Sequence, residues 1–250
     1  MYRPVRISRR SLQRFVIIAL PWALIASSVT DAVADEVLIE DAFERTDPGT
    51  AMENLGGGWT TNSRSRAGGN RQVWFKDGAM YIERHAQADH GVSVVHEAAF
   101  DDVRISLRFK ISKGDRLGLN LADMKEKSVH AGHICMAIIR PDRVELRDLK
   151  TGNMDYQRRQ RRQAGKATAE DKRIVKAKTK TFKTTTSTDQ WHTAELVLRG
   201  DTMTIAIDGN TIGSFASEGI DHPTKSRLRI AVEKTAWVDD LKLERLSPKD

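Results

Sequence analysis

The strongest constraint on the fold is a strict two-residue alternation of apolar and polar side chains. In "DVRISLRFKIS" (102–112) every second residue is apolar, namely Val103, Ile105, Leu107, Phe109 and Ile111. Successive side chains of a β-strand point to opposite faces, so such a run predicts a strand with one face in a core. Runs of the same kind occur along most of the chain.

Tight turns join several of these runs. The segment 191–215, "WHTAELVLRGDTMTIAIDGNTIGSF", predicts a three-stranded meander, and its second turn holds an Asp-Gly pair that supplies the positive φ of tight hairpins. Segments 72–84, 227–233 and 238–246 alternate in the same way. We predict eleven or twelve strands. A single sheet of that size would leave one apolar face in water, so the fold class is predicted as all-β, a two-sheet antiparallel β-sandwich of jelly-roll type.

The first 34 residues predict a secretory signal peptide. Five arginines precede an apolar run at 15–29, and Ala32 and Ala34 form a small-x-small cleavage pattern. The run contains Pro21 and is shorter than the roughly 20 apolar residues of a spanning helix. We therefore expect an exported protein, periplasmic or secreted, with no stable membrane span after cleavage behind Ala34. The segment "SRRSLQR" also fits the twin-arginine route.

Basic residues concentrate in one part of the chain. The formal net charge is +7, and residues 143–183 contain 14 Lys and Arg against five Asp and Glu. Within this part, about 152–183 lacks alternation and predicts a helical or loop insert in a single jelly-roll domain, 35–250. The run "QRRQRRQ" is typical of nucleic-acid segments. Export, and the presence of only Tyr156 and Phe182 for base stacking, argue against nucleic acid and leave a solvated surface or contact with an anionic polysaccharide.

Five segments carry a resemblance to a known family. They are "EDAFERTDP" (40–48), "GGGW" (56–59), "VWFKDGAMYIE" (73–83), the 191–215 meander and "AWVDDLKLERL" (236–246). Together they resemble the concanavalin A-like lectin/glucanase jelly roll and, within it, the 3-keto-disaccharide hydrolase domain family, often labelled family 16-like glycoside hydrolases. The resemblance covers roughly residues 37–246. The E-x-D-x-x-E motif of true family 16 glucanases is absent, because "VELRD" around Glu145 does not reproduce it.

Three consecutive runs predict a polar sheet face opposite the core. They are "RLGLNLA" (116–122), "GHICMAII" (132–139) and "RVELRDL" (143–149). The alternation places Ile134, Met136 and Ile138 in the core. On the opposite face we expect small and polar residues from these strands and the preceding one, namely Arg104, Asn120, His133, Cys135, Glu145 and Arg147. In a curved jelly-roll sheet, such a face is the concave floor of a groove.

The resemblance implies cleavage of 3-keto-glycosides in this groove. A ketone at C3 acidifies the hydrogen at C2, so a base can remove it, the C1 substituent can leave by elimination, and water can add afterwards. The step requires a base with a pKa near neutrality and a positive group for the developing enolate. We expect His133 or His130 as the base, with Glu145 and Asp123 as the next candidate catalytic residues.

Other residues complete the expected site. The candidate substrate contacts are Asn120, Arg104, Arg147, Asp148, Trp59 and Trp74, the last two because sugar rings stack on indoles. Asp41 and Asp240 are candidate ligands for a structural calcium ion of the kind found in this superfamily, and no other cofactor is implied. The expected partner is a carbohydrate, either a keto-disaccharide or a polysaccharide, with an anionic one included.

Two other functions fit the same residues. The non-core face of any antiparallel sheet is polar, so the chain could equally be a non-catalytic glycan-binding module or an envelope adhesion protein that uses its basic insert. A zinc site in "HAGHIC" (130–135) is disfavoured, because the segment offers at most three ligands and a closed structural site takes four. Cys135 has apolar neighbours and is expected to pack as a small side chain.

Overall fold

The computed structural model describes residues 2, 35–47, 49 and 53–248. Apart from Tyr2, the predicted signal peptide lies outside the described residues. Residues 35–47, 49 and 53–248 belong to one compact unit. None of the helices in the described ranges is long and apolar enough to span a membrane.

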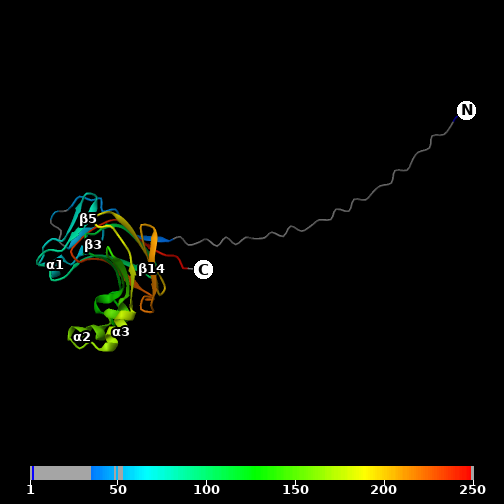
Figure 1. Ribbon diagram of the computed structural model, residues 1–250. Helices are drawn as coiled ribbons and strands as arrows, with labels where there is room; N and C mark the ends of the chain where they lie inside the picture. The colour runs from blue at the N-terminus through cyan, green and yellow to red at the C-terminus, as the bar shows by residue number, and fades with distance from the viewer. Residues whose placement is uncertain (1, 3–34, 48, 50–52, 249–250) are drawn as a thin grey trace. The chain divides into compact units, whose positions relative to one another are not determined.

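Two antiparallel sheets form the sandwich (Figure 1). The first, called the outer sheet here, has the order β14-β13-β12-β7-β16-β5-β4, with β1 paired to β16. Its strands are β1 (Glu36–Asp41), β4 (Val73–Lys76), β5 (Ala79–Glu83), β7 (Val103–Lys110), β12 (His192–Arg199), β13 (Thr202–Ile207), β14 (Asn210–Ala216) and β16 (Thr235–Arg245). The meander predicted at 191–215 is β12 to β14, and its Asp208-Gly209 turn has the expected positive φ at both residues.

The second sheet, called the inner sheet here, has the order β11-β10-β9-β8-β15-β6-β3-β2. Its strands are β2 (Asn54–Gly56), β3 (Trp59–Thr61), β6 (Val92–Phe100), β8 (Leu117–Ala122), β9 (His133–Ile139), β10 (Arg143–Asp148), β11 (Thr179–Lys183) and β15 (Lys225–Val232). The short helix α1 (Ser63–Arg66) follows β3. The described part thus contains sixteen strands, more than the eleven or twelve predicted, because several are short.

The core lies between the two sheets and follows the predicted alternation. From β7 the outer sheet contributes Ile105, Leu107 and Phe109, and each is at most 3% exposed. Leu117 and Leu119 face them from the inner sheet and are fully buried. Burying a side chain of this size stabilises the fold by roughly 1.5–3 kcal/mol. These opposed faces confirm the predicted all-β sandwich.

The basic insert consists of two short helices and then an edge strand. Asp155 caps the N-terminus of helix α2 (Tyr156–Gln163), because its side chain accepts a hydrogen bond from the backbone N–H of Arg158. Helix α3 (Ala169–Ala177) begins at Thr168, which forms a reciprocal capping box with Asp171. The chain then returns as β11 and pairs with β10. Residues 179–183 therefore belong to the inner sheet and not to the insert.

Strand β7 corrects the prediction for Arg104. It does not extend the inner sheet, because the turn at residues 101–102 carries the chain from β6 in one sheet to β7 in the other. Arg104 accordingly lies outside the groove face. Its guanidinium pairs with Asp35 at 3.0 Å and with Glu195 at 3.5 Å.

Candidate functional site

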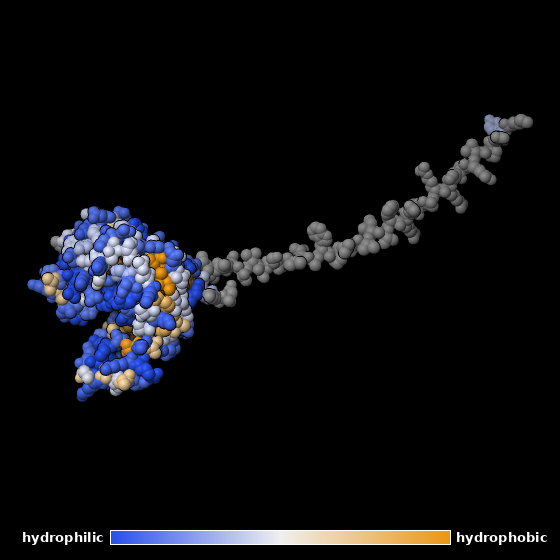
Figure 2. Space-filling model, in the orientation of Figure 1, coloured by the Kyte–Doolittle hydropathy of each residue, from blue (hydrophilic) through white to orange (hydrophobic). Residues whose placement is uncertain are grey.

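A groove crosses the inner sheet on the face away from the core. Its volume is about 430 Å³, and Figure 2 shows the molecule hollowed between its main body and the helical insert. Strands β6, β8, β9, β10 and β15 supply the floor, and loops around His90 and Asn153 supply the walls. The polar and charged side chains that the floor strands contribute include Asn120, His133, Arg147 and Arg229.

A β-bulge at the start of β9 turns His133 toward this groove. Residue Leu121 pairs with Cys135 but Ala122 pairs with His133, so one extra residue, Ile134, is accommodated in β9. Ile134 and Cys135 are both buried in the core, whereas Met136 lines the groove. The prediction was therefore right for His133 and Ile134. It was wrong for the rest of the strand, where Cys135 and Ala137 face the core and Met136 and Ile138 face the groove.

The turn before β9 requires a glycine. Gly132 has a φ of +70°, and a Cβ built there would lie 2.2 Å from the carbonyl oxygen of Asp123. The backbone N–H of Asp123 donates to the Gly132 carbonyl at 2.8 Å and locks the two segments together. This close approach fixes the point at which β9 begins and hence the position of His133.

His133, Asn120 and Arg229 form a hydrogen-bonded group that we call the His133 cluster. Asn120 donates through Nδ2 to the Cys135 carbonyl at 3.1 Å, so its Oδ1 is oriented toward His133. His133 Nδ1 lies 2.8 Å from that oxygen, which assigns the proton to Nδ1 and leaves Nε2 unprotonated, as an acceptor. The register of β8 and β15 places Arg229 directly opposite Asn120.

Burial and the neighbouring cation keep His133 neutral. Burial is the main cause, and the positive charge of Arg229 adds to it, so that the pKa of His133 is lowered to about 3. The Arg229 Nη1 atom is 3.1 Å from Nδ1 and 3.5 Å from Nε2. A base with a pKa near neutrality was expected here, and in the free protein His133 is a much weaker base than that.

Arg229 is a buried cation that forms no ion pair with the residues that the structure describes. Arg229 is 8% exposed, and burial lowers the pKa of its guanidinium to about 10. Its partners in the described part of the chain are neutral: Asn120 Oδ1, the Ala131 carbonyl at 2.9 Å, the Met124 sulfur and His133 Nε2 at 3.5 Å. Burying a charge without an ion-pair partner costs several kcal/mol. This site is therefore prepared to receive a negative charge from a ligand.

Arg147 also lines the groove, and its guanidinium forms an ion pair with Glu145. Arg147 Nε donates to Glu145 at 3.1 Å, and Arg143 and Arg140 also lie against this carboxylate. Burial would raise the pKa of Glu145, but the hydrogen bond and charge of Arg147 outweigh it and lower the pKa. Glu145 does not line the groove, so its role in this structure is to position Arg147.

His130 lies beside the groove and not in its lining. Its ring centroid is 6.3 Å from that of His133, and its backbone N–H donates to the Met154 carbonyl at 2.9 Å. Burial is the main cause that lowers the pKa of His130, followed by the charges of Arg159 and Arg229.

Two predicted carboxylates serve the fold instead of the groove. Asp148 is fully buried and accepts hydrogen bonds from the backbone N–H groups of Thr151 (2.9 Å) and Gly219 (3.1 Å) and from the Ser217 hydroxyl (2.7 Å). Asp123 is 4% exposed and accepts from His222 and Thr224. Burial alone would raise the pKa of Asp123, but its hydrogen bonds lower it.

Neither predicted tryptophan lines the groove. Trp59 is fully buried, and its Nε1–H donates to Asp41 at 3.0 Å. Trp74 is half-buried on the outer sheet, where its ring centroid is 5.7 Å from that of Tyr81. Trp59 belongs to β3, a strand of three residues, which is too short for the alternation to show its direction.

The two aspartates proposed for calcium have protein partners. Asp41 pairs with Arg45 and also accepts the Phe43 backbone N–H at 2.8 Å. Asp240 is exposed and lies 3.4 Å from Arg108. Within residues 35–47 and 53–248, no group of three or more His, Cys, Asp or Glu side chains is arranged to hold a metal ion.

Sequence reasoning missed the residues that approach from distant strands. Arg229 alternates with Leu228 and Ile230 in "RLRIAVE", so its direction could have been found. Its place beside Asn120 could not, because the two residues are 109 positions apart. His90, Arg84, Arg116 and Glu233 also line the groove, and they come from loops or strand ends without a periodic signal.

A family model supports the resemblance seen in the sequence. The 3-keto-α-glucoside-1,2-lyase-like domain matches residues 49–243. Among curated protein sequences, none matches this chain.

Solved structures support the fold. The laminarinase from Rhodothermus marinus aligns with a TM-score of 0.56 at 13% identity, covering 86% of this chain and 99% of that one. The endo-β-1,3-glucanase from Pyrococcus furiosus aligns at 0.52 and 13% identity, covering 86% and 96%. A sialidase aligns at 0.56 and 8% identity, covering 85% of this chain, which spans 19% of that protein's length. At sequence identities this low, the alignments show a shared jelly-roll fold and nothing about activity.

Proposed function

Because the chain belongs to the 3-keto-α-glucoside-1,2-lyase-like domain family, we propose that the groove of the inner sheet binds a 3-keto-glycoside and cleaves its C1–O bond by elimination. The observation that carries this proposal is Arg229, a buried guanidinium without an ion-pair partner among the described residues, next to an imidazole whose Nε2 is unprotonated. A ketone oxygen that becomes an enolate supplies the missing negative charge.

The bonds change in two steps. His133 Nε2 takes the hydrogen from C2 as a proton, and the C–H electrons form a C2–C3 double bond with the negative charge on the C3 oxygen beside Arg229. The enolate then reforms the ketone, a C1–C2 double bond appears, and the C1–O bond breaks. The departing oxygen takes up a proton from the His133 imidazolium, directly or through water, and the imidazole returns to its neutral form. Water can afterwards add across C1 and C2 to give the free 3-keto sugar.

The cluster also accounts for how a weak base can act here. The positive charge of Arg229 opposes protonation of His133 in the free protein. As the enolate forms, its charge offsets that of Arg229, so the imidazolium becomes favourable in the transition state and not before it. Asn120 Oδ1 accepts a hydrogen bond from the Nδ1–H group and keeps the ring in the required tautomer.

Hydrolysis by paired carboxylates fits the groove less well. The carboxylates among its lining residues are Asp89 and Glu233, and both have cationic partners. Glu233 lies 2.7 Å from Arg116, and Asp89 lies 3.4 Å from Arg66. A glycosidase of that type needs one carboxyl group protonated at working pH. We further propose that the protein acts after export, on the strength of its leader.

Substrate choice tests the proposed function. The protein should release nitrophenol from 4-nitrophenyl 3-keto-α-glucoside and leave unoxidised 4-nitrophenyl α-glucoside intact, because only the ketone acidifies the C2 hydrogen. Release is followed by absorbance with both compounds at equal concentration. Equal release from both would replace elimination by ordinary hydrolysis. Binding of either compound without release would favour the alternative, a glycan-binding module.

A further inference from the structure

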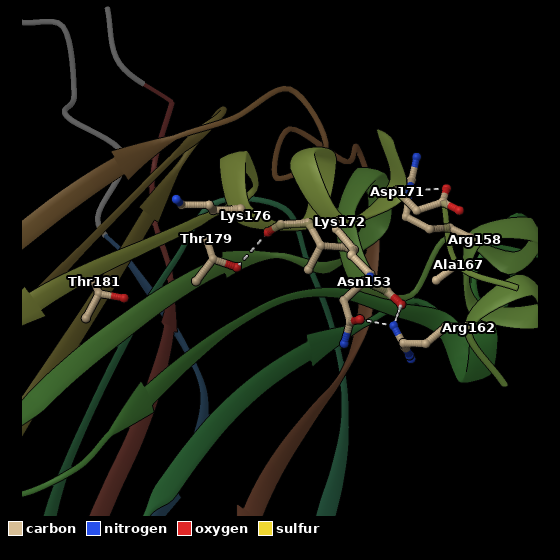
Figure 3. A pocket seen from close by; sticks show the side chains of 10 residues that line it. Asn153, Arg158, Arg162, Ala167, Asp171, Lys172, Lys176, Thr179 and Thr181 are labelled. Atoms are coloured by element: carbon tan, nitrogen blue, oxygen red, sulfur yellow. Dashed lines mark hydrogen bonds and ion pairs between the residues drawn. The ribbon is translucent and has the colours of Figure 1, made fainter. Parts of the chain in front are cut away.

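A second cavity lies between the insert and the edge of the inner sheet. Its volume is about 530 Å³, within the range of small-ligand sites. Helices α2 and α3, the turn at Leu149–Asn153 and strand β11 line it. Figure 3 shows Arg162 bonded to Asn153 at one end and Lys172 and Lys176 on α3.

Four of the five charged residues that line the cavity are cations. The charged lining residues are Arg158, Arg162, Lys172, Lys176 and Asp171. The one carboxylate among them is already neutralised, because Arg161 binds Asp171 through two hydrogen bonds of 2.9 and 2.6 Å. Arg158 also lies within 3.7 Å of Asp171, so the lining cations without an ion pair among the described residues are Arg162, Lys172 and Lys176.

The two arginines build the wall of the cavity. Arg158 donates through Nη1 to the Thr151 and Gly152 carbonyls at 3.0 and 2.7 Å. Its Nε atom is buried and has no hydrogen-bond partner in the described structure. Arg162 donates through Nη1 to the Asn153 carbonyl at 3.0 Å. These bonds fix the turn. Arg158 also lies 3.7 Å from the carboxylates of Asp155 and Asp171, whereas Arg162 has no ion pair among the described residues.

The two lysines of the lining are exposed and form no ion pair with the described residues. Lys172 and Lys176 are exposed and one turn apart on α3, so they share a face of the helix. Neither has an ion pair in the described part of the chain, although the same insert pairs Arg161 with Asp171 and Arg173 with Glu170. Their ammonium groups are therefore free to bind an anion.

Asn153 connects this cavity to the groove, because it lines both. We propose that the cavity is a subsite for the acidic group of the glycan whose keto-sugar occupies the groove. The bound group is an oxyanion on a sugar, either the carboxylate of a uronic acid or a sulfate ester. This proposal rests on the proposed function for the groove and adds the substrate class, an acidic glycan.

Binding of defined trisaccharides tests the subsite without requiring turnover. Isothermal titration calorimetry compares trigalacturonate, sulfated galactotriose and neutral galactotriose on the full chain at low salt. We expect at least one acidic probe to bind about tenfold tighter than the neutral one, a difference of about 1.4 kcal/mol. The preference should shrink at 1 M salt, where the Debye length falls to about 3 Å. The tighter acidic probe identifies carboxylate or sulfate as the preferred group.

Two matched double variants separate a local site from net charge. K172Q/K176Q removes the two cavity ammonium groups and keeps good helix formers in α3, so it should lose the acidic preference without a change in the melting curve. K166Q/K180Q removes the same charge from exposed residues that do not line the cavity, and it should keep the preference.

Each outcome decides one of the two proposals. Equal affinity for all three probes, no binding of any probe, or equal loss in both double variants would overturn the subsite. Cleavage of the neutral keto-glucoside with no acidic preference would leave the proposed function standing without the subsite. Acidic preference abolished by K172Q/K176Q in a protein that cleaves no keto-glycoside would leave the subsite standing without the proposed function.

Discussion

Arg229→Met is expected to lower kcat/KM for a 3-keto-glucoside by about two to three powers of ten while the protein stays folded. Removing one oxyanion-stabilising donor typically has an effect of this size on turnover. The fold should tolerate the change, because methionine has a similar length and removes a buried charge that has no ion-pair partner among the described residues. Initial rates of the wild type and of Arg229→Met measure the loss of turnover, and thermal melts of the same two proteins show whether the variant stays folded.

Arg227→Met is the matched control. Arg227 lies on the same strand and carries the same charge, but it pairs with Glu97 and does not line the groove. Its loss should change turnover by no more than a few-fold. If Arg229→Met fails to fold, Arg229→Lys, which keeps the charge but not the planar fork, takes its place and should still lose activity. Full activity in a folded Arg229→Met protein would contradict the role of this residue.

Acid is expected to destabilise the protein through His133. The folded-state pKa is about 3 and the unfolded-state pKa is about 6.5. Between these values the unfolded chain binds a proton that the folded chain does not, so the free energy of unfolding falls as the pH falls. The loss is about 1.4 kcal/mol per pH unit below 6.5, which amounts to about 3 kcal/mol at pH 4.

Urea unfolding at pH 7, 5.5 and 4 measures this contribution. His133→Gln has no titrating group at this position, so the free-energy difference between wild type and variant should shrink by about 3 kcal/mol between pH 7 and pH 4. Arg229→Met should show a weaker acid dependence than the wild type, because one of the causes that lower the pKa of His133 is gone. Parallel pH profiles for all three proteins would show that His133 is not buried in its neutral form.

The strands and the core could be predicted because their signal is local. Alternation in 102–112 and the Asp-Gly pair in 191–215 identify strands and turns from neighbouring residues. Alternation failed within β9, where the bulge at Ile134 reverses the faces of all later residues. His133 was assigned correctly because it precedes the bulge.

The candidate site could be predicted only in part because it is assembled from distant strands. Asn120, His133 and Arg147 come from consecutive strands and were placed together correctly. Arg229 arrives from β15, which inserts between β8 and β6, and no local pattern reports that pairing. Arg104 was misplaced for the opposite reason, because its strand follows β6 in sequence but crosses to the other sheet.

The fate of the C2 hydrogen tests elimination most directly. Proton NMR can follow a 3-keto-α-glucoside with the protein in D₂O. We expect the C2 proton of the sugar to be lost, with either deuterium at C2 or a C1–C2 alkene in the product, and we expect Arg229→Met to slow this change together with release of the C1 group. Release of the C1 group with the C2 proton fully retained would contradict the account.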